Sequence, residues 1–358
     1  MPRPWLVIVA AAALLSPLAG AQTPLPGGIS HWEQVGVGLE DAHVTRIAVD
    51  KNGVMFAGLS DYGTLGVFSL APDSPAWKAT TAGLRPEGAV VVLPGPDGGI
   101  IAQQGLTTAD GGAFRGLVAT SSPAGWISIK EHRPGEVWPF VVGGAFNAPV
   151  GTFVLSGASR YLEEELFLFG TKGGSKSVAM VPLSLVAVTF NFGPSGSMYG
   201  ADFCYLARSE PGAINMTADI KFVSIKGPLG DKGCSKSAEY TSIAEGPGGA
   251  VYVAVGPRDL NATARVSGVF RMSATRATWT DITTNLPDSY WYSLGTDASG
   301  NIFAAAYGEG VWVLPPQATQ WLPVNTGLTG GALTISQLQF INGVPYLSTD
   351  AGVFVGRK

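Results

Sequence analysis

The stretch VDKNGVMFAG, residues 49–58, is a turn that ends at Gly53 followed by a short apolar strand. Short apolar runs separated by Gly, Pro, Asn and Asp are typical of all-β proteins. The pattern recurs as PGPDGGIIAQ (94–103), NAPVGTFVLSG (147–157), FGPSGSMYGA (192–201), EGPGGAVYVA (245–254), TDASGNIFAA (296–305) and FINGVPYLST (340–349). The mean spacing of these copies is about 48 residues. A repeat of that length indicates propeller blades, each made of four short strands.

Each well-preserved copy continues with the same two strands. A Gly-Val-Phe or Gly-Val-Trp strand is followed by a hairpin, a Trp and a Gly-Leu or Asn-Leu turn. The Gly of this strand is Gly66, Gly268, Gly310 or Gly352, and the Trp is Trp77, Trp279 or Trp321. We therefore predict an all-β fold, a seven-bladed β-propeller of four-stranded blades. Because large aromatic side chains bury the most area, we expect these Trp residues to pack between neighbouring blades.

The last copy ends at Lys358 without a Trp strand, whereas HWEQVGVGL (31–39) supplies one near the N-terminus. We predict that the Trp32 strand completes the last blade and closes the ring, which removes the exposed edges of a linear array. Residues 22–358 then form a single propeller domain. The third and fourth blades, about 137–239, lack a Trp strand and are degenerate copies.

The pattern W…GL…V…IAVD-NG…GVF resembles the repeats of two-component-regulator sensor propellers. It is also similar to Asp-box propellers, the group that includes sialidases and photosystem assembly factors. The resemblance covers nearly all of residues 22–358 and implies the fold rather than a function. The Asp and Gly of the Asp box are absent or displaced in SLAPDSPAW (69–77), RMSATRATW (271–279) and VLPPQATQW (313–321).

The N-terminus has the three parts of a secretory signal peptide. Arg3 precedes the apolar run WLVIVAAAALL (5–15), and Ala19-Gly20-Ala21 offers a cleavage site. We predict that residues 1–21 are removed, that no membrane span remains, and that the protein is secreted or periplasmic. In an oxidising compartment Cys204 and Cys234 favour a disulfide, with a reactive or metal-binding thiol as the alternative. Asn215 and Asn261 lie in glycosylation triplets, which matter only in a eukaryotic source.

The composition limits the possible partners. The net charge is −4 and only 13% of residues are charged, with no basic run, so we predict no nucleic-acid partner. No cofactor motif is present, and we expect no metal site, because the calcium-loop-like Asp50-Lys51-Asn52-Gly53 is better explained as a hairpin turn. We expect a monomer.

The loops that enter each inner strand, and those between second and third strands, meet at one end of the central channel. They contain most of the charged and aromatic loop residues, whereas the other turns are mostly Gly, Pro, Asn and Ser. That end is therefore the expected ligand site. Its candidate ligand-binding residues are His43, Arg46, Asp61, Tyr62, Arg85, Arg133, Trp138, Tyr290, Trp291, Tyr307 and Glu309.

Two functions fit this end. The first is an exported binding or scaffold protein for a glycan, peptide or protein partner. The alternative is a carbohydrate-active enzyme, a glycoside hydrolase or polysaccharide lyase, whose carboxylates, Tyr or His would meet at the same end. Arg46 lies in TRIA (45–48), which resembles the Arg-Ile-Pro of sialidases, but no motif supplies the other two arginines of such a site. Because no catalytic set is recognisable, the binding role is favoured over the enzyme.

Overall fold

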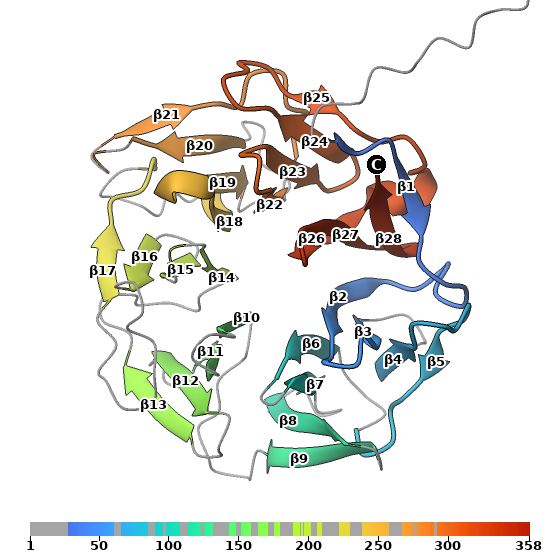
Figure 1. Cartoon of the computed structure of the whole chain (residues 1–358). Helices are drawn as coiled ribbons and strands as arrows, with labels where there is room; N and C mark the ends of the chain where they lie inside the picture. The colour runs from blue at the N-terminus through green and yellow to red at the C-terminus, as the bar shows by residue number, and fades with distance from the viewer. Residues whose placement is uncertain are drawn as a thin grey trace, which may run out of the picture.

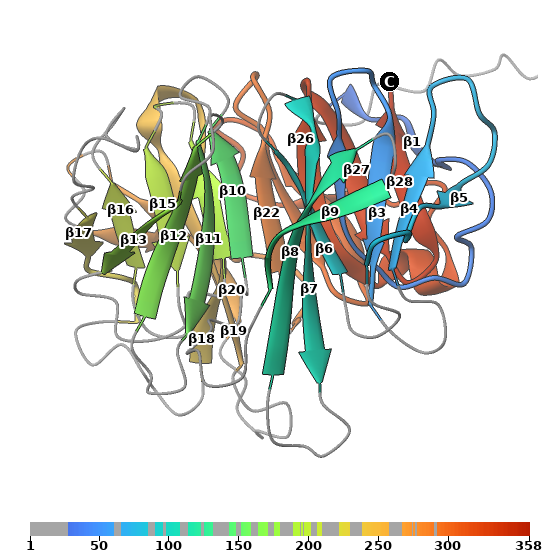
Figure 2. The same ribbon diagram turned by 90° about the horizontal axis from the view of Figure 1, so that it is seen from below.

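A computed structural model describes residues 28–60, 66–84, 90–95, 98–107, 114–122, 125–131, 143–147, 152–158, 164–170, 175–179, 189–193, 195, 197–201, 206–209, 222–229, 238–257, 267–273, 275, 278–289 and 292–358. These residues form seven four-stranded antiparallel sheets. The sheets are arranged in a ring, with the first strand of each nearest the centre (Figure 1). The predicted all-β propeller fold is confirmed. Figure 2 shows the sheets from the side, with their strands running between the two ends of the ring.

We number the sheets by their inner strands. Sheet 1 contains β2 (Val44–Val49), β3 (Met55–Leu59), β4 (Gly66–Leu70) and β5 (Lys78–Ala79). Sheet 2 contains β6 (Val90–Pro94), β7 (Ile100–Thr107), β8 (Phe114–Ser122) and β9 (Gly125–Glu131). Sheet 3 contains β10 (Gly143–Asn147), β11 (Thr152–Ala158), β12 (Glu164–Gly170) and β13 (Ser175–Ala179). Sheet 4 contains β14 (Thr189–Phe192), β15 (Met198–Ala201), β16 (Leu206–Ser209) and β17 (Phe222–Ile225).

Sheet 5 contains β18 (Ala238–Glu245), β19 (Val251–Pro257), β20 (Gly268–Met272) and β21 (Trp279–Asp281). Sheet 6 contains β22 (Tyr292–Thr296), β23 (Ile302–Ala306), β24 (Gly310–Leu314) and β25 (Leu322–Pro323). Sheet 7 contains β26 (Ile335–Ile341), β27 (Val344–Thr349), β28 (Gly352–Arg357) and β1 (His31–Gln34). Two short 3₁₀ turns, η4 (Pro247–Gly249) and η5 (Gly330–Leu333), lie in connections.

The ring closes as predicted. β1 pairs with β28 in antiparallel register, Trp32 opposite Gly356. The exposed side chains of Glu33 and Arg357 add an ion pair at 2.6 Å. The outer strand of sheet 7 therefore comes from the opposite end of the chain from its other three strands.

The tryptophans join neighbouring sheets, as predicted. Five indoles each donate the Nε1 hydrogen to a backbone carbonyl that follows the outer strand of the preceding sheet. The five bonds are Trp32 to Val324 (2.6 Å), Trp77 to Val35 (2.6 Å), Trp126 to Thr80 (2.5 Å), Trp279 to Lys226 (2.7 Å) and Trp321 to Ile282 (2.6 Å). The core lies in the same seams, because the buried clusters join side chains of adjacent sheets. Apolar burial and a hydrogen-bonded indole thus stabilise each of these five seams between sheets.

The Gly-Leu and Asn-Leu turns meet these tryptophans. A Cβ on Gly83 would lie 2.2 Å from the Trp126 carbonyl oxygen, and φ of Gly83 is +92°, so only glycine fits there. Asn285 takes the equivalent place in sheet 5 with φ 61°. Its side-chain amide bonds the backbone N–H and C=O of Trp321, at 2.9 and 2.7 Å. The repeat motif therefore encodes the contact between sheets.

Some backbone N–H groups at the edges of the inner strands donate hydrogen bonds to side chains of the neighbouring sheet. The backbone N–H of Leu294 donates to Ser242 Oγ at 3.0 Å, and that of Leu338 donates to Ser293 Oγ at 3.0 Å. At the closing seam the N–H of Ile47 donates to Gln339 Oε1 at 3.2 Å. These bonds pair edge groups that would otherwise be unsatisfied near the ring axis.

Candidate functional site

Four of the eleven predicted ligand-binding residues lie in the described part of the chain: His43, Arg46, Tyr307 and Glu309. The others fall outside it, namely Asp61, Tyr62, Arg85, Arg133, Trp138, Tyr290 and Trp291. Residues 1–21, Cys204, Cys234, Asn215 and Asn261 also fall outside, so the signal peptide, disulfide and glycosylation remain predictions.

Three of the four predicted residues lie along one continuous line of loops over sheets 6, 7 and 1. The Gly308 N–H donates to Leu333 O, and the Asp350 N–H donates to Thr334 O, both at 3.1 Å. The side chains of Asp350 and His43 are hydrogen-bonded, which links sheet 7 to sheet 1. We call residues 288–289, 307–309, 333–334, 350 and 43 the loop arc. It lies at the end of the ring that the sequence analysis favoured.

Carboxylates dominate the loop arc. Glu309 is exposed, and its carboxylate makes no hydrogen bond or ion pair with any described residue. Asp288 accepts a hydrogen bond from the Ser267 hydroxyl. Burial raises the pKa of the nearby Tyr292 phenol, and the negative charges of Asp288 and Glu309 raise it further, against the lowering effect of hydrogen bonds with Ser267 and Ser289. Both carboxylates therefore lie close enough to Tyr292 to raise its pKa.

Tyr307 and His43 complete the arc. Tyr307 is half-buried, and its backbone carbonyl accepts from the Ser289 hydroxyl at 3.4 Å. His43 is held from two sides: its ring contacts Asp350, and its carbonyl accepts from the Ser60 N–H at 3.1 Å. An aromatic ring beside several hydrogen-bond acceptors suits a ligand that carries hydroxyl or ammonium groups.

Arg46 lies on β2, directly after a bulge at Thr45. Ser242 has the corresponding place on β18, after a bulge at Thr241, and there it accepts a backbone N–H of the next sheet. An arginine has no acceptor for such a bond. The Nε of Arg46 is buried without a partner among the described residues, and burial lowers its pKa to about 10. Arg46 is thus a positive charge in the inner wall at neutral pH.

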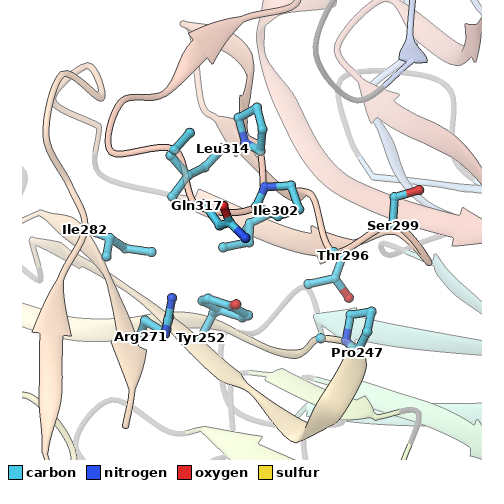
Figure 3. A pocket seen from close by; sticks show the side chains of 14 residues that line it. Pro247, Tyr252, Arg271, Ile282, Thr296, Ser299, Ile302, Leu314 and Gln317 are labelled. Carbon is cyan, nitrogen blue, oxygen red and sulfur yellow. The ribbon is translucent and has the colours of Figure 1, made fainter. Parts of the chain in front are cut away.

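A pocket lies at the other end of the ring, between sheets 5 and 6 (Figure 3). Its volume is about 330 Å³, near the lower limit for small-molecule sites. The β18–β19, β22–β23 and β24–β25 turns form its rim. Its lining includes Tyr252, Arg271, Ile282, Ile302, Leu314 and Gln317. The sequence analysis did not single out this end, because its turns contain few charged residues and Tyr252, Arg271 and Gln317 are far apart in the chain.

No three His, Cys, Asp or Glu side chains among the described residues are grouped so that they could hold a metal ion. The Asp50 turn matches its interpretation as a hairpin, since Asp50 Oδ1 accepts the N–H groups of Asn52 and Val54, both at 2.8 Å. Within the described ranges, no helix is long and apolar enough to span a bilayer.

Comparison with known proteins supports the fold. No family model matches the chain, and no curated protein matches it. A streptogramin B lyase structure is similar with a TM-score of 0.61 and 12% identity, over 91% of this chain and 96% of that one. A catalytically inactive virginiamycin B lyase from Staphylococcus aureus with quinupristin gives 0.63 and 10%, over 91% and 99%. The extracellular domain of the putative one-component system BT4673 from B. thetaiotaomicron gives 0.62 and 16%, over 92% of this chain and 40% of that one. These identities establish the propeller fold only.

Proposed function

We propose that this protein is an exported β-propeller that binds a neutral or positively charged ligand, a glycan or a peptide, at the loop arc. The observation that carries the proposal is the line of carboxylates from Asp288 through Glu309 to Asp350, beside Tyr307. Carboxylates accept hydrogen bonds from sugar hydroxyls and ammonium groups and repel polyanions. Because loops on a rigid scaffold commonly carry binding function, this end is suited to recognition.

Export and a binding role are supported by two further observations. Residues 1–21 have the composition of a signal peptide. One similar structure is the extracellular domain of a putative one-component system. We further propose that Cys204 and Cys234 form a disulfide in the exported protein, to be tested by intact mass with and without reductant after alkylation.

The test uses purified protein that begins at Gln22. Binding to cationic chitosan oligosaccharides, neutral cello-oligosaccharides and anionic oligogalacturonates is measured on a glycan array. Binding to lysine-rich and glutamate-rich peptides is measured by calorimetry. We expect binding to neutral or cationic members and none to galacturonate. Glu309→Gln and Asp350→Asn should each weaken that binding by about tenfold.

The control is Glu33→Gln, which removes an exposed carboxylate on the outer strand β1 and should leave binding unchanged. Equal binding by the Glu309→Gln/Asp350→Asn double variant and the parent protein would refute the loop arc as the site. If the protein instead cleaves one of these oligosaccharides, and Glu309→Gln abolishes cleavage, the carbohydrate-active enzyme replaces the binding protein as the function.

A further inference from the structure

The pocket between sheets 5 and 6 contains an arginine that has no partner among the described residues. Arg271 lies on β20 and is exposed, and its guanidinium makes no ion pair or hydrogen bond with any described residue. Its register partner on β19 is Tyr252. Figure 3 shows the two side chains next to one another, both at the floor of the pocket. A guanidinium has a planar set of donors that matches the two oxygens of a carboxylate.

Tyr252 supplies a second donor beside this guanidinium. It is 7% exposed, and its hydroxyl forms no hydrogen bond to the part of the chain that is described. Burial raises its pKa, and the opposing effect of the Arg271 charge shows that the two groups are close. The phenol is therefore protonated at neutral pH and can donate its hydrogen to an anion.

Gln317 points into the same space from the opposite wall (Figure 3). It is the third residue of a turn in which the Ala318 N–H donates to Pro315 O at 3.1 Å, and its φ is 66°. A turn with Pro in second place and positive φ in third place normally has Gly there. A non-Gly residue in this conformation is strained, and such strain is concentrated at functional sites. Gln317 therefore has a backbone conformation that glycine would adopt with less strain, and its side chain presents an amide to the pocket.

The remaining walls are mostly apolar. Ile302 and Leu314 are buried at 5% and 6% exposure, and Ile282, Pro315 and Pro316 also line the space. Such walls bury the body of a ligand, while a few polar groups fix its orientation. The polar groups are two donors side by side, one amide across from them, and the hydroxyls of Thr296 and Ser299, of which that of Thr296 donates to Glu245 O at 3.0 Å.

We propose that this pocket binds a small carboxylate with an apolar ring or chain. The carboxylate lies between Arg271 and the hydroxyl of Tyr252, the amide of Gln317 contacts the same end, and the body lies against Ile302 and Leu314. This site is independent of the loop arc, which is at the other end of the ring.

The test uses ligand-observed NMR and calorimetry on the whole mature protein, with three probes. Phenylacetate has the carboxylate and an apolar ring, phenylacetamide has the ring without the charge, and glucuronate has the charge on a hydroxylated ring. We expect phenylacetate to bind at least about tenfold more tightly than either of the others. Arg271→Gln should reduce phenylacetate binding by about tenfold or more, and Tyr252→Phe by about threefold to tenfold.

Gln317→Gly separates a binding role from a structural one. Glycine relieves the strain of the left-handed turn, so the melting temperature should stay the same or rise while phenylacetate binding weakens. Lys78→Gln, which removes an exposed positive charge from β5, is the control and should change neither quantity. Three outcomes would each overturn the site: no phenylacetate binding at millimolar concentration, equal binding of phenylacetamide, or unchanged binding by Arg271→Gln.

Discussion

The two ends of the ring use their carboxylates differently. At the pocket end Asp297 is engaged in its own turn: Oδ1 accepts the N–H groups of Ser299 and Asn301, both at 2.9 Å, and Oδ2 accepts the Asn301 amide at 2.6 Å. Glu245, also at this end, is 4% exposed and accepts from the Tyr199 hydroxyl at 3.0 Å. At the loop arc Glu309 is exposed without a partner in the described structure. Carboxylates at the pocket end are thus engaged in hydrogen bonds, whereas at the loop arc Asp288 and Asp350 are bonded and Glu309 is open to a ligand.

The largest expected effect tests whether both ends depend on one closed ring. Deleting residues 30–38 removes β1 and the 2%-exposed Trp32, and leaves β28 with an open edge. We expect the free energy of unfolding to fall by more than about 5 kcal/mol, measured by urea denaturation. A deletion variant that unfolds at the same urea concentration as the parent would show that the ring does not need this strand.

The next largest effect should distinguish the pocket end of the ring from the loop arc. Trp321 is fully buried, and its indole donates to Ile282 O, a residue that lines the pocket. Trp321→Ala should lower the free energy of unfolding by about 3–5 kcal/mol and weaken phenylacetate binding more than binding at the loop arc. Trp279→Ala is the comparison, because Trp279 is only partly buried and should cost less. Equal losses at both ends would mean that the seam supports them equally.

The third prediction concerns the effect of Arg46, on the inner strand β2, on the stability of the folded protein. The Nε of Arg46 is buried without a partner in the described part of the chain, which destabilises the folded protein, so Arg46→Met should raise the free energy of unfolding by about 1–3 kcal/mol. Burial holds the folded pKa near 10, below the unfolded value. The cost of the buried charge is therefore fully present below pH 10 and is relieved as the pH rises through 10. The gain from Arg46→Met should accordingly be constant between pH 6 and 9, by thermal unfolding across that range. A loss of stability would show that Arg46 has a partner.

The smallest effect tests the comparison directly. Asp297→Ala removes three hydrogen bonds of a turn and should lower the free energy of unfolding by about 1–2 kcal/mol. Glu309→Ala should change it by less than about 0.5 kcal/mol. Both values come from parallel urea titrations. If Glu309→Ala destabilises as much as Asp297→Ala, its carboxylate is structural and the distinction between the ends is lost.

The sequence predicted the features that recur in several copies of the repeat, such as the Trp strand. It did not predict the pocket, whose residues are each found in one copy only. The well-preserved copies place a Trp in the outer strand, which predicts Trp32 in the closing strand, and the pairing with β28 confirms it. The pocket could not be predicted in this way. Arg271 and Gln317 lie in RMSATRATW (271–279) and VLPPQATQW (313–321), two ordinary copies of the same segment of the unit, and only the packing of sheet 5 against sheet 6 brings them together. Tyr252 belongs to one of the apolar runs that identify the repeat, so its pattern indicates a core residue, which it largely is.

The pairing of β1 with β28 also constrains when the protein can fold. Glu33 and Arg357, which meet across this pair, are 324 residues apart in the chain. Because the chain is synthesised from its N-terminus, the strand that contains Trp32 has no pairing partner until β28 has been made. Contacts between distant residues slow folding, and unpaired strand edges invite association with other chains. The strand that closes the finished ring is thus an unpaired edge in the unfinished chain, open to association with other chains until β28 has been made.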